Sequence, residues 1–363
     1  MTDDGVSAAM LTTDSTLQSA QVGAAMQQTG IRFLVIGAPK AGTTSLFEYM
    51  RLHPQLHMPA EKELYFFNID RNYRRGMSWY LDTVLRQAPP GAVCGEATTE
   101  YMSGAPYLDD ESDPALRSLA RSELEEVIPR RIRQALPDAK LICVLRDPVK
   151  RAYSHYRMMV LSQVESRSFE ETVEQLVDPA ALERTRVERT RTNGYIVSGE
   201  YARLLGAFLR VFPREQLKVI FSDELSEQPA KTVAELFEFI GVDANFVPEN
   251  VNTRYRAAAV KQRIPGLNLV LWQAGMARVT PARTLWHALP TKVRHTIDSA
   301  YNIANYRVEM WNAWRGAVSE DIAPPVRERL IAHYRADSEA LAELLDREVP
   351  WLSAWNASSN RSR

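Results

Sequence analysis

The chain has 363 residues, of which 45% are hydrophobic, and this is long enough for one large α/β domain or two ordinary ones. Its 44 basic and 45 acidic side chains leave a net charge of −1, which excludes the basic composition of a general nucleic-acid binder. The two cysteines, Cys94 and Cys143, lie in apolar, strand-like surroundings without metal-ligand spacing. We expect buried free thiols rather than a disulfide framework, which suits a reducing compartment.

The first 28 residues are rich in Ser, Thr, Gln, Ala and Asp and predict a flexible tail. Asp3 and Asp4 stand where a secretory signal peptide carries positive charge, and no long apolar core follows them. No segment of the sequence reaches the roughly 20 apolar residues that a membrane-spanning helix needs. We therefore expect a cytoplasmic protein without an integral membrane segment. The sequence does not indicate its oligomeric state.

Apolar runs that predict strands alternate with helical patterns along the chain. The expected strands are a run beginning at Phe33, then Ala92–Glu96, Lys140–Leu145 and Leu217–Phe221. The expected helices are one that ends before Pro54, then Arg117–Leu136, one starting at Pro148, Arg203–Phe212, Val233–Ile240 and Pro324–Leu345. This alternation predicts a P-loop-like three-layer α/β fold, with a central, mainly parallel sheet flanked by helices.

The sequence predicts one domain over residues 29–356, followed by a short tail at 357–363. Within that domain, the residues from about Val260 to Asn305 are rich in Arg and Trp and have a helical pattern. We expect the region of about 257–315 to form a helical insertion or a cap.

The first strand runs directly into a loop typical of phosphate binding. The loop and the start of the next helix hold Lys40, Ala41, Gly42, Thr43, Thr44 and Ser45. A strand, a short loop and a helix N-terminus together direct backbone N–H groups at a phosphate. Gly37 and Gly42 keep the glycine spacing of a Walker A motif, but Thr43 stands where that motif has its lysine.

A second strand-to-helix junction carries an arginine that a buried strand does not tolerate without an anionic partner. Arg146 follows the apolar run that ends at Leu145, and Asp147-Pro148 begins the next helix. Ser154 lies seven residues after Asp147, about two helical turns, so it returns to the same helix face. A guanidinium and a hydroxyl can therefore converge on one anion.

These two segments resemble those of sulfotransferases that use 3′-phosphoadenosine-5′-phosphosulfate (PAPS). The Lys40–Ser45 loop is similar to their 5′-phosphosulfate loop, and Arg146 with Ser154 is similar to their 3′-phosphate site. Residues 61–67, with the sequence Glu-Lys-Glu-Leu-Tyr-Phe-Phe, resemble the segment of the heparan-type enzymes whose glutamate is the catalytic base. The resemblance covers roughly Ile31 to Trp355 and is weakest between Arg254 and Arg315.

The resemblance implies a set of site residues. Glu63 is the implied base, and Lys40 is implied to stabilise charge on the leaving phosphate oxygen. The implied donor-binding residues are Lys40, Ala41, Gly42, Thr43, Thr44, Ser45, Arg146 and Ser154. Candidates to close over the nucleotide are Arg254, Arg256, Lys261 and Arg263. No metal ion is implied, and the sequence shows no cluster with metal-ligand spacing.

Two departures from the heparan-type pattern bear on the acceptor. Ala97 stands where those enzymes often have a lysine, so one contact to an anionic saccharide is expected to be absent. The late disulfide and Lys-Gly-Arg loop of the Golgi enzymes have no clear counterpart in this sequence.

The expected activity is transfer of the PAPS sulfuryl group to a hydroxyl, with 3′-phosphoadenosine-5′-phosphate (PAP) as the second product. A glutamate base points to a carbohydrate, or to a glycosylated or lipid-linked metabolite, as acceptor, and no nucleic acid is expected. Two alternatives stay open: a P-loop kinase of a small molecule, and a catalytically silent nucleotide-binding scaffold. For Glu63 beside Lys62, a surface ion pair is the alternative to a catalytic role.

Overall fold

The computed structural model describes residues 30–108, 112–190, 192–253 and 322–361, together with single positions and two short strands between 254 and 321. The expected tail at 1–28 lies outside the described residues. At the other end, helix α18 (Pro350–Arg361) continues through most of the tail expected at 357–363.

A five-stranded sheet forms the centre of the molecule, and all its described pairings are parallel. Its order is β2 (Leu56–His57), β3 (Val93–Ala97), β1 (Ile31–Gly37), β4 (Lys140–Leu145) and β5 (Leu217–Phe221). The side chains of β1 and β4 are almost all buried, as expected for strands covered on both faces. The predicted α/β fold is confirmed. Only β2 was not foreseen, because two residues are too few to form a pattern.

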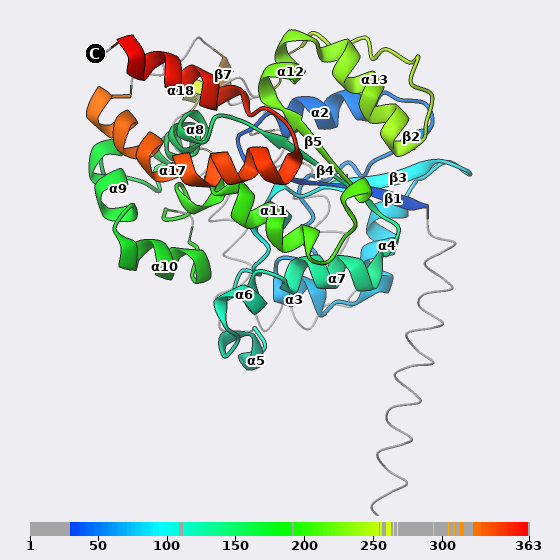
Figure 1. The fold of residues 1–363 in the computed structure, drawn as a ribbon. Coiled ribbons are helices and arrows are strands. Elements are labelled where there is room, and N and C mark those ends of the chain that lie inside the picture. The colour runs from blue at the N-terminus through cyan, green and yellow to red at the C-terminus, as the bar shows by residue number, and fades with distance from the viewer. Residues whose placement is uncertain are drawn as a thin grey trace, which may run out of the picture.

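Helices cover both faces of the sheet (Figure 1). On one face lie α2 (Thr43–Met50), α12 (Ser222–Glu227) and α13 (Pro229–Ile240), and on the other lie α4 (Met77–Leu85), α7 (Val127–Ala135) and α11 (Tyr201–Leu209). The described residues also form α3 (Asp70–Tyr73), α5 (Pro114–Arg117), α6 (Arg121–Leu124), α8 (Pro148–Leu161), α9 (Phe169–Leu176), α10 (Pro179–Val187) and α17 (Pro324–Leu345), with 3₁₀ turns η1 (Thr99–Ser103), η2 (Val197–Gly199) and η3 (Arg214–Gln216).

The expectation of one helix over Arg117–Leu136 was wrong, because the structure divides this stretch among α5, α6 and α7. Pro129 gives the physical reason for the last break. Proline has no N–H to donate, and its ring clashes with the carbonyl four residues earlier, so a continuous helix cannot pass through it. In the structure α7 restarts at Val127, which places Pro129 within the first turn of the new helix.

The prediction of helix from Val260 was also wrong at its start. Residues 259–262 form strand β6 (Ala259–Gln262), which pairs antiparallel with β7 (Ala313–Arg315). The two ends of the expected helical insertion are therefore joined by a short ladder. Most of the stretch between them lies outside the described residues.

Cys94 on β3 and Cys143 on β4 are both buried and free, as predicted. Burial raises the pKa of the Cys143 thiol to about 12, so this side chain packs as a small apolar group.

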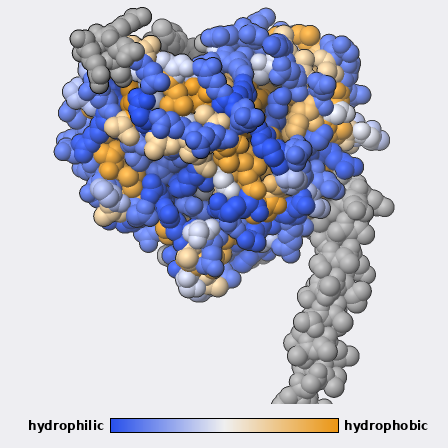
Figure 2. Space-filling view, in the orientation of Figure 1, coloured by the Kyte–Doolittle hydropathy of each residue, from blue (hydrophilic) through white to orange (hydrophobic). Residues whose placement is uncertain are grey.

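The face shown in Figure 2 is mainly hydrophilic, with hydrophobic residues showing in short stretches between the helices. Within the described part of the chain, we found no helix with both the length and the apolar character that crossing a membrane requires.

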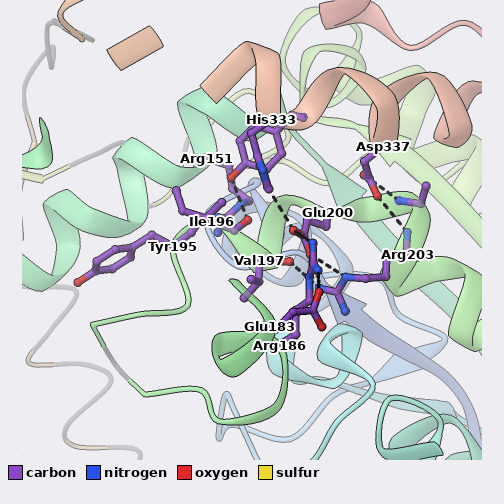
Figure 3. Close-up of polar contacts among 12 residues, drawn as sticks. Arg151, Glu183, Arg186, Tyr195, Ile196, Val197, Glu200, Arg203, His333 and Asp337 are labelled. Carbon is purple, nitrogen blue, oxygen red and sulfur yellow. Dashed lines mark hydrogen bonds and ion pairs between the residues drawn. The ribbon is translucent and has the colours of Figure 1, made fainter. Parts of the chain in front are cut away.

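A buried ion network fastens α10, α11 and α17 together (Figure 3). Its centre is Glu200, which begins α11 and is 3% exposed. Arg186 of α10 contacts its carboxylate at 2.7 Å, Arg203 of α11 at 2.6 Å, and His333 of α17 at 3.2 Å. Asp337 of α17 also accepts backbone N–H groups of α11 from Ala202 and Arg203. Burial by itself raises the pKa of Glu200, but His333, Arg186 and Arg203 together lower it.

We predict that Glu200→Gln lowers the free energy of unfolding by about 2 kcal/mol, because it removes the buried carboxylate that Arg186 and Arg203 share and leaves them only their pairs with Glu183 and Glu125. The matched control is Glu183→Gln. Glu183 pairs with the same Arg186 but its side chain is 57% exposed, so the expected loss is below about 0.5 kcal/mol. Urea denaturation of both variants measures the difference, and equal losses would contradict this account.

Candidate active site

Three parallel strands end at the same edge of the sheet and bring the sequence-predicted segments together. β1 leads into the Lys40 loop, β3 into Thr98 and Thr99, and β4 into Arg146. Because β1 lies between β3 and β4, its loop is flanked by the segments that follow both neighbours. Ligands of open α/β sheets bind at the carboxyl ends of the strands, so this edge is the candidate active site.

The Lys40 loop leaves the N-terminus of α2 open. Gly42 is the N-cap residue, with a φ of 112° that favours glycine, and it has no side chain with which to cap the helix. The first N–H groups of a helix have no intrahelical partner, so the first turn, from Thr43 to Ser45, presents donors suited to an anion. Gly37 is required for packing, because a Cβ there would lie 2.5 Å from Cβ of Met102.

Arg146 lies against the Lys40 loop. Its Nη1 atom donates to the carbonyl oxygen of Lys40 at 3.5 Å. The backbone carbonyl oxygen of Arg146 accepts a hydrogen bond from the Tyr201 hydroxyl at 2.8 Å. Asp147, directly after it, caps α8: its Oδ1 atom accepts the N–H of Val149 at 2.8 Å. Asp147 therefore caps the N-terminus of α8. The two predicted phosphate-type segments are adjacent in space, as the sequence indicated.

Ser154 lies two turns into α8, and the next turn of the same helix face touches the loop. The Nζ atom of Lys40 lies 3.4 Å from the sulfur of Met158, four residues after Ser154. Residues four apart share a helix face, so the Lys40 amine lies beside the face that carries Ser154. His155, read from the sequence as structural, is buried and packs against Tyr195.

The Glu63 carboxylate is held by the residue that follows β3 by two positions. The N–H of Thr99 donates to Oε2 at 3.0 Å, and its hydroxyl donates to Oε1 at 2.9 Å. Lys62 lies 3.7 Å from Glu63, and its Nζ atom is also 3.5 Å from the Thr43 hydroxyl oxygen. The side chains of Lys62 and Glu63 are only 4% and 15% exposed, so the surface-ion-pair interpretation was wrong.

Ser45 contacts a segment far away in the sequence. Its hydroxyl oxygen accepts the N–H of Tyr255 at 3.0 Å and lies 3.4 Å from the Tyr255 carbonyl oxygen. One turn later, the Tyr49 hydroxyl donates to the carbonyl of Thr253 at 2.8 Å. The α2 helix thus anchors Thr253 and Tyr255. Of the four expected closing cations, Lys261 lies on β6, and Arg254, Arg256 and Arg263 are outside the described residues.

A small cavity lies between the Lys40 loop and η1. Its lining includes Pro39, next to Lys40, and Thr99, which binds Glu63. Glu100 and Arg189 also line it. Burial raises the pKa of Glu100, and the Arg189 charge opposes that rise. Over the ranges that the structure describes, we found no group of three side chains placed to hold a metal ion.

Sequence reasoning missed Thr98 and Thr99, although a signal was present. Both follow a predicted strand directly, and the same rule that selected Lys40 and Arg146 applies to them. Their partners, however, lie more than 30 residues earlier in the chain, and no local pattern identifies such a contact.

The fold and this edge are those of an α/β protein in which two strand-end loops meet at an uncapped helix N-terminus, with a carboxylate beside them. Residues 31–263, more than half of the chain, match the sulfotransferase domain family. The chain belongs to that family of PAPS-dependent enzymes.

Two relatives and one solved structure illustrate the similarity. Human bifunctional heparan sulfate N-deacetylase/N-sulfotransferase 2 is 29% identical over 218 residues, covering 58% of this chain and 22% of that protein. Mouse heparan sulfate glucosamine 3-O-sulfotransferase 3B1 is 28% identical, covering 58% of this chain and 45% of that protein. The chain thus spans less than half the length of these relatives. A sulfotransferase from Alicyclobacillus acidocaldarius, 24% identical, shares the fold with a TM-score of 0.57 over 90% of this chain and 98% of that one.

We predict that Ser45→Ala raises the exchange rate of the Tyr255 amide by about fivefold to tenfold, since one hydrogen bond contributes about 1 kcal/mol. Hydrogen–deuterium exchange of the peptide containing Tyr255 measures the change. The control is Ser226→Ala, because the Ser226 hydroxyl bonds only within its own exposed turn. Unchanged exchange in Ser45→Ala would show that α2 does not anchor the segment.

Proposed function

We propose that this chain transfers the sulfuryl group of PAPS to a hydroxyl of a carbohydrate, or of a glycosylated or lipid-linked metabolite. The observation that carries the proposal is the connection made by Lys62. Its amine contacts Glu63 and the hydroxyl oxygen of Thr43, so the proposed base is fastened to the start of the donor-binding helix. A carboxylate held this close to a phosphate-type loop is suited to take a proton at the point of transfer.

The donor is proposed to bind across both strand-end loops. The first-turn N–H groups of α2 and the Lys40 amine would hold the 5′-phosphosulfate, because an uncapped helix N-terminus and a cation both favour an anion. Arg146 and Ser154 would hold the 3′-phosphate, with a guanidinium supplying charge and a hydroxyl a further bond. PAPS supplies an activated sulfuryl group, and the remaining roles belong to the protein.

The proposed reaction is a single in-line displacement. The bond from sulfur to the 5′-phosphate oxygen breaks as a bond from sulfur to the acceptor oxygen forms. The acceptor proton passes to the Glu63 carboxylate, and the leaving phosphate keeps the bonding electron pair beside Lys40. As in phosphoryl transfer, positioning and charge stabilisation supply most of the rate.

The acceptor class is supported by the kind of base and by the relatives. The proposed base, Glu63, is a glutamate, and the two named relatives are described as heparan sulfate sulfotransferases. One of the relatives is an N-sulfotransferase, so an amine acceptor is the competing outcome of the test.

The kinase alternative requires a carboxylate to hold magnesium near the loop. Asp147 directly follows β4 and is the acidic residue to consider for this role. Its Oδ1 atom accepts backbone N–H groups of α8, while its Oδ2 atom lies 3.4 Å from the Trp355 indole nitrogen. These contacts commit Asp147 to capping the helix, which weakens the kinase alternative.

The test of the proposed function uses radiolabelled PAPS with three acceptor probes: heparosan, N-deacetylated heparosan and a simple phenol. Label transfer to heparosan is the expected result. Transfer only to the N-deacetylated polymer would identify an amine acceptor, and transfer only to the phenol would overturn the carbohydrate assignment. Strict dependence on ATP and magnesium would instead support the kinase alternative, and tight PAP binding without any transfer would support the scaffold.

We predict that Arg146→Ala weakens PAP binding by about 10- to 100-fold, the loss of about 1.5–3 kcal/mol for a hydrogen bond to a charged group. ADP binding should change far less, because ADP has no 3′-phosphate. Calorimetric titration without magnesium measures both. Arg117→Ala, which removes an exposed arginine on α5, is the control. Equal losses for PAP and ADP would refute the Arg146 assignment.

We predict that Glu63→Gln lowers kcat by about 10²- to 10⁴-fold, the usual contribution of a positioned base. PAP affinity should stay nearly unchanged, because Glu63 is not among the donor-binding residues. Initial rates with saturating PAPS and the acceptor probe give kcat. Glu170→Gln, at an exposed position on α9, serves as the control. Full activity of Glu63→Gln would exclude a role as base.

A further inference from the structure

The segment that carries Glu63 is supported by a fully buried carboxyl group. Glu96, the fourth residue of β3, has no exposed surface. Three hydroxyl groups surround its carboxylate: Thr98 donates to Oε2 at 2.9 Å, Tyr80 donates to Oε1 at 3.3 Å, and a further hydrogen bond joins Tyr101 to it. A carboxylate accepts several hydrogen bonds but donates none, so it fixes the direction of all three hydroxyl groups.

Two of these hydroxyl groups hold the backbone that follows Glu63. The Thr98 oxygen accepts the N–H groups of Leu64 at 3.1 Å and Tyr65 at 3.3 Å. The Tyr101 oxygen accepts the N–H of Phe66 at 3.1 Å. Each oxygen can accept these amides because its own hydrogen points at the buried carboxylate.

Protonation of Glu96 would disturb this arrangement, because Thr98 has no lone pair left to accept another hydrogen. Thr98 already uses its one hydrogen and both of its lone pairs. A protonated Glu96 must donate its new hydrogen to one of the hydroxyl groups around it, and Thr98 can accept it only by releasing an amide. Tyr80 can accept it only by turning its own hydrogen away from Glu96, so the ionised form is the one in which all three hydroxyl groups donate to the carboxylate at once.

We propose that Glu96 is a positioning residue for the sulfuryl-transfer site: by orienting the Thr98 and Tyr101 hydroxyl groups, its carboxylate holds residues 64–66 and so fixes the proposed base Glu63. This inference rests on the proposed function of Glu63. The hydrogen-bond network around Glu96 does not depend on that function, and amide exchange tests it separately.

The electrostatic surroundings of Glu96 give the inference a pH dependence. Burial is the main cause that raises the pKa of Glu96 to about 7, and the nearby Glu63 charge adds to the rise, while Tyr101, Thr98 and Tyr80 oppose it through hydrogen bonds. The two tyrosines, on η1 and α4, stay neutral because burial and Glu96 raise their pKa values well above 10.

Stability and positioning should respond to pH in opposite directions. Because the folded chain raises the pKa of Glu96 above its usual value, ionised Glu96 costs stability: its favourable contribution is present in acid and is lost as the pH rises through about 7. The support of residues 64–66 needs the ionised form and is lost as the pH falls through the same range. A buried carboxyl group without this positioning role would change the stability of the fold with pH but would leave the support of residues 64–66 unchanged.

The decisive measurement is hydrogen–deuterium exchange at the amides of Leu64, Tyr65 and Phe66, corrected for intrinsic rates, at about pH 6 and about pH 8, on either side of the Glu96 pKa of about 7. In the native protein, protection should be greater at the higher pH. In Glu96→Gln, it should be lower by about tenfold at the higher pH and should lose its pH dependence, since a glutamine amide cannot accept all three hydroxyl hydrogens. Equal protection of the two proteins at the higher pH would overturn the proposal.

A second variant keeps the test valid if Glu96→Gln folds poorly. Tyr80→Phe removes one hydrogen bond to the carboxylate but keeps the ring that stacks on Phe66 with centroids 4.5 Å apart. Loss of a donor disfavours the ionised form, so the midpoint of the pH-dependent protection should move to higher pH. An unmoved midpoint would show that Glu96 does not control these amides.

Turnover separates this inference from the proposed function. If heparosan accepts the label, kcat of Glu96→Gln should fall by about tenfold or more while PAP affinity stays unchanged, because misplacing a catalytic group by a fraction of an ångström has effects of this size. An unchanged kcat would overturn the positioning role. If the native protein transfers label to no probe, the proposed function fails, and the exchange experiment still decides whether Glu96 supports residues 64–66.

Discussion

The site depends on the parallel pairing of β1 with both β3 and β4. Pairing in this direction brings three carboxyl ends to one edge, so that a cationic loop, two threonines and an arginine become neighbours although the sequence separates them by up to about 100 residues. The strands are apolar because they are buried on both faces. The polar groups of the β1 and β4 segments therefore lie mainly where these strands end, which brings them to a single edge.

Two buried carboxylates serve the protein in different ways. Glu200 is paired with guanidinium groups that lower its pKa, and it joins three helices into one rigid support. Glu96 has no cation among the partners that set its pKa, and burial raises that pKa to about 7. The first carboxylate fastens secondary structure together. The second is surrounded by neutral hydroxyl groups, and so it can order hydrogen bonds without adding a counter-charge near the proposed base.

The sequence predicted the parts of this protein that rest on local patterns. The runs that became β1, β4 and β5 are almost continuously apolar, and the glycine and hydroxyl residues after β1 have a characteristic spacing. The break before Pro129 was missed because the charge pattern continued across it. The support of Glu63 by Thr99 was missed because the two residues are 36 positions apart, and they meet only because β2, the strand before Glu63, pairs with β3. Whether Lys62 and Glu63 formed a surface pair was a question of burial, which a local pattern does not answer.

Thr98 and Thr99 are chemically identical neighbours with opposite tasks. One holds the backbone after Glu63, and the other, which begins η1, holds the Glu63 carboxylate. Inserting or deleting one residue between Ala97 and Thr98 would move both hydroxyl groups away from these partners. The spacing between β3 and the two threonines is therefore what an engineer redesigning the acceptor site must preserve, together with both hydroxyl groups.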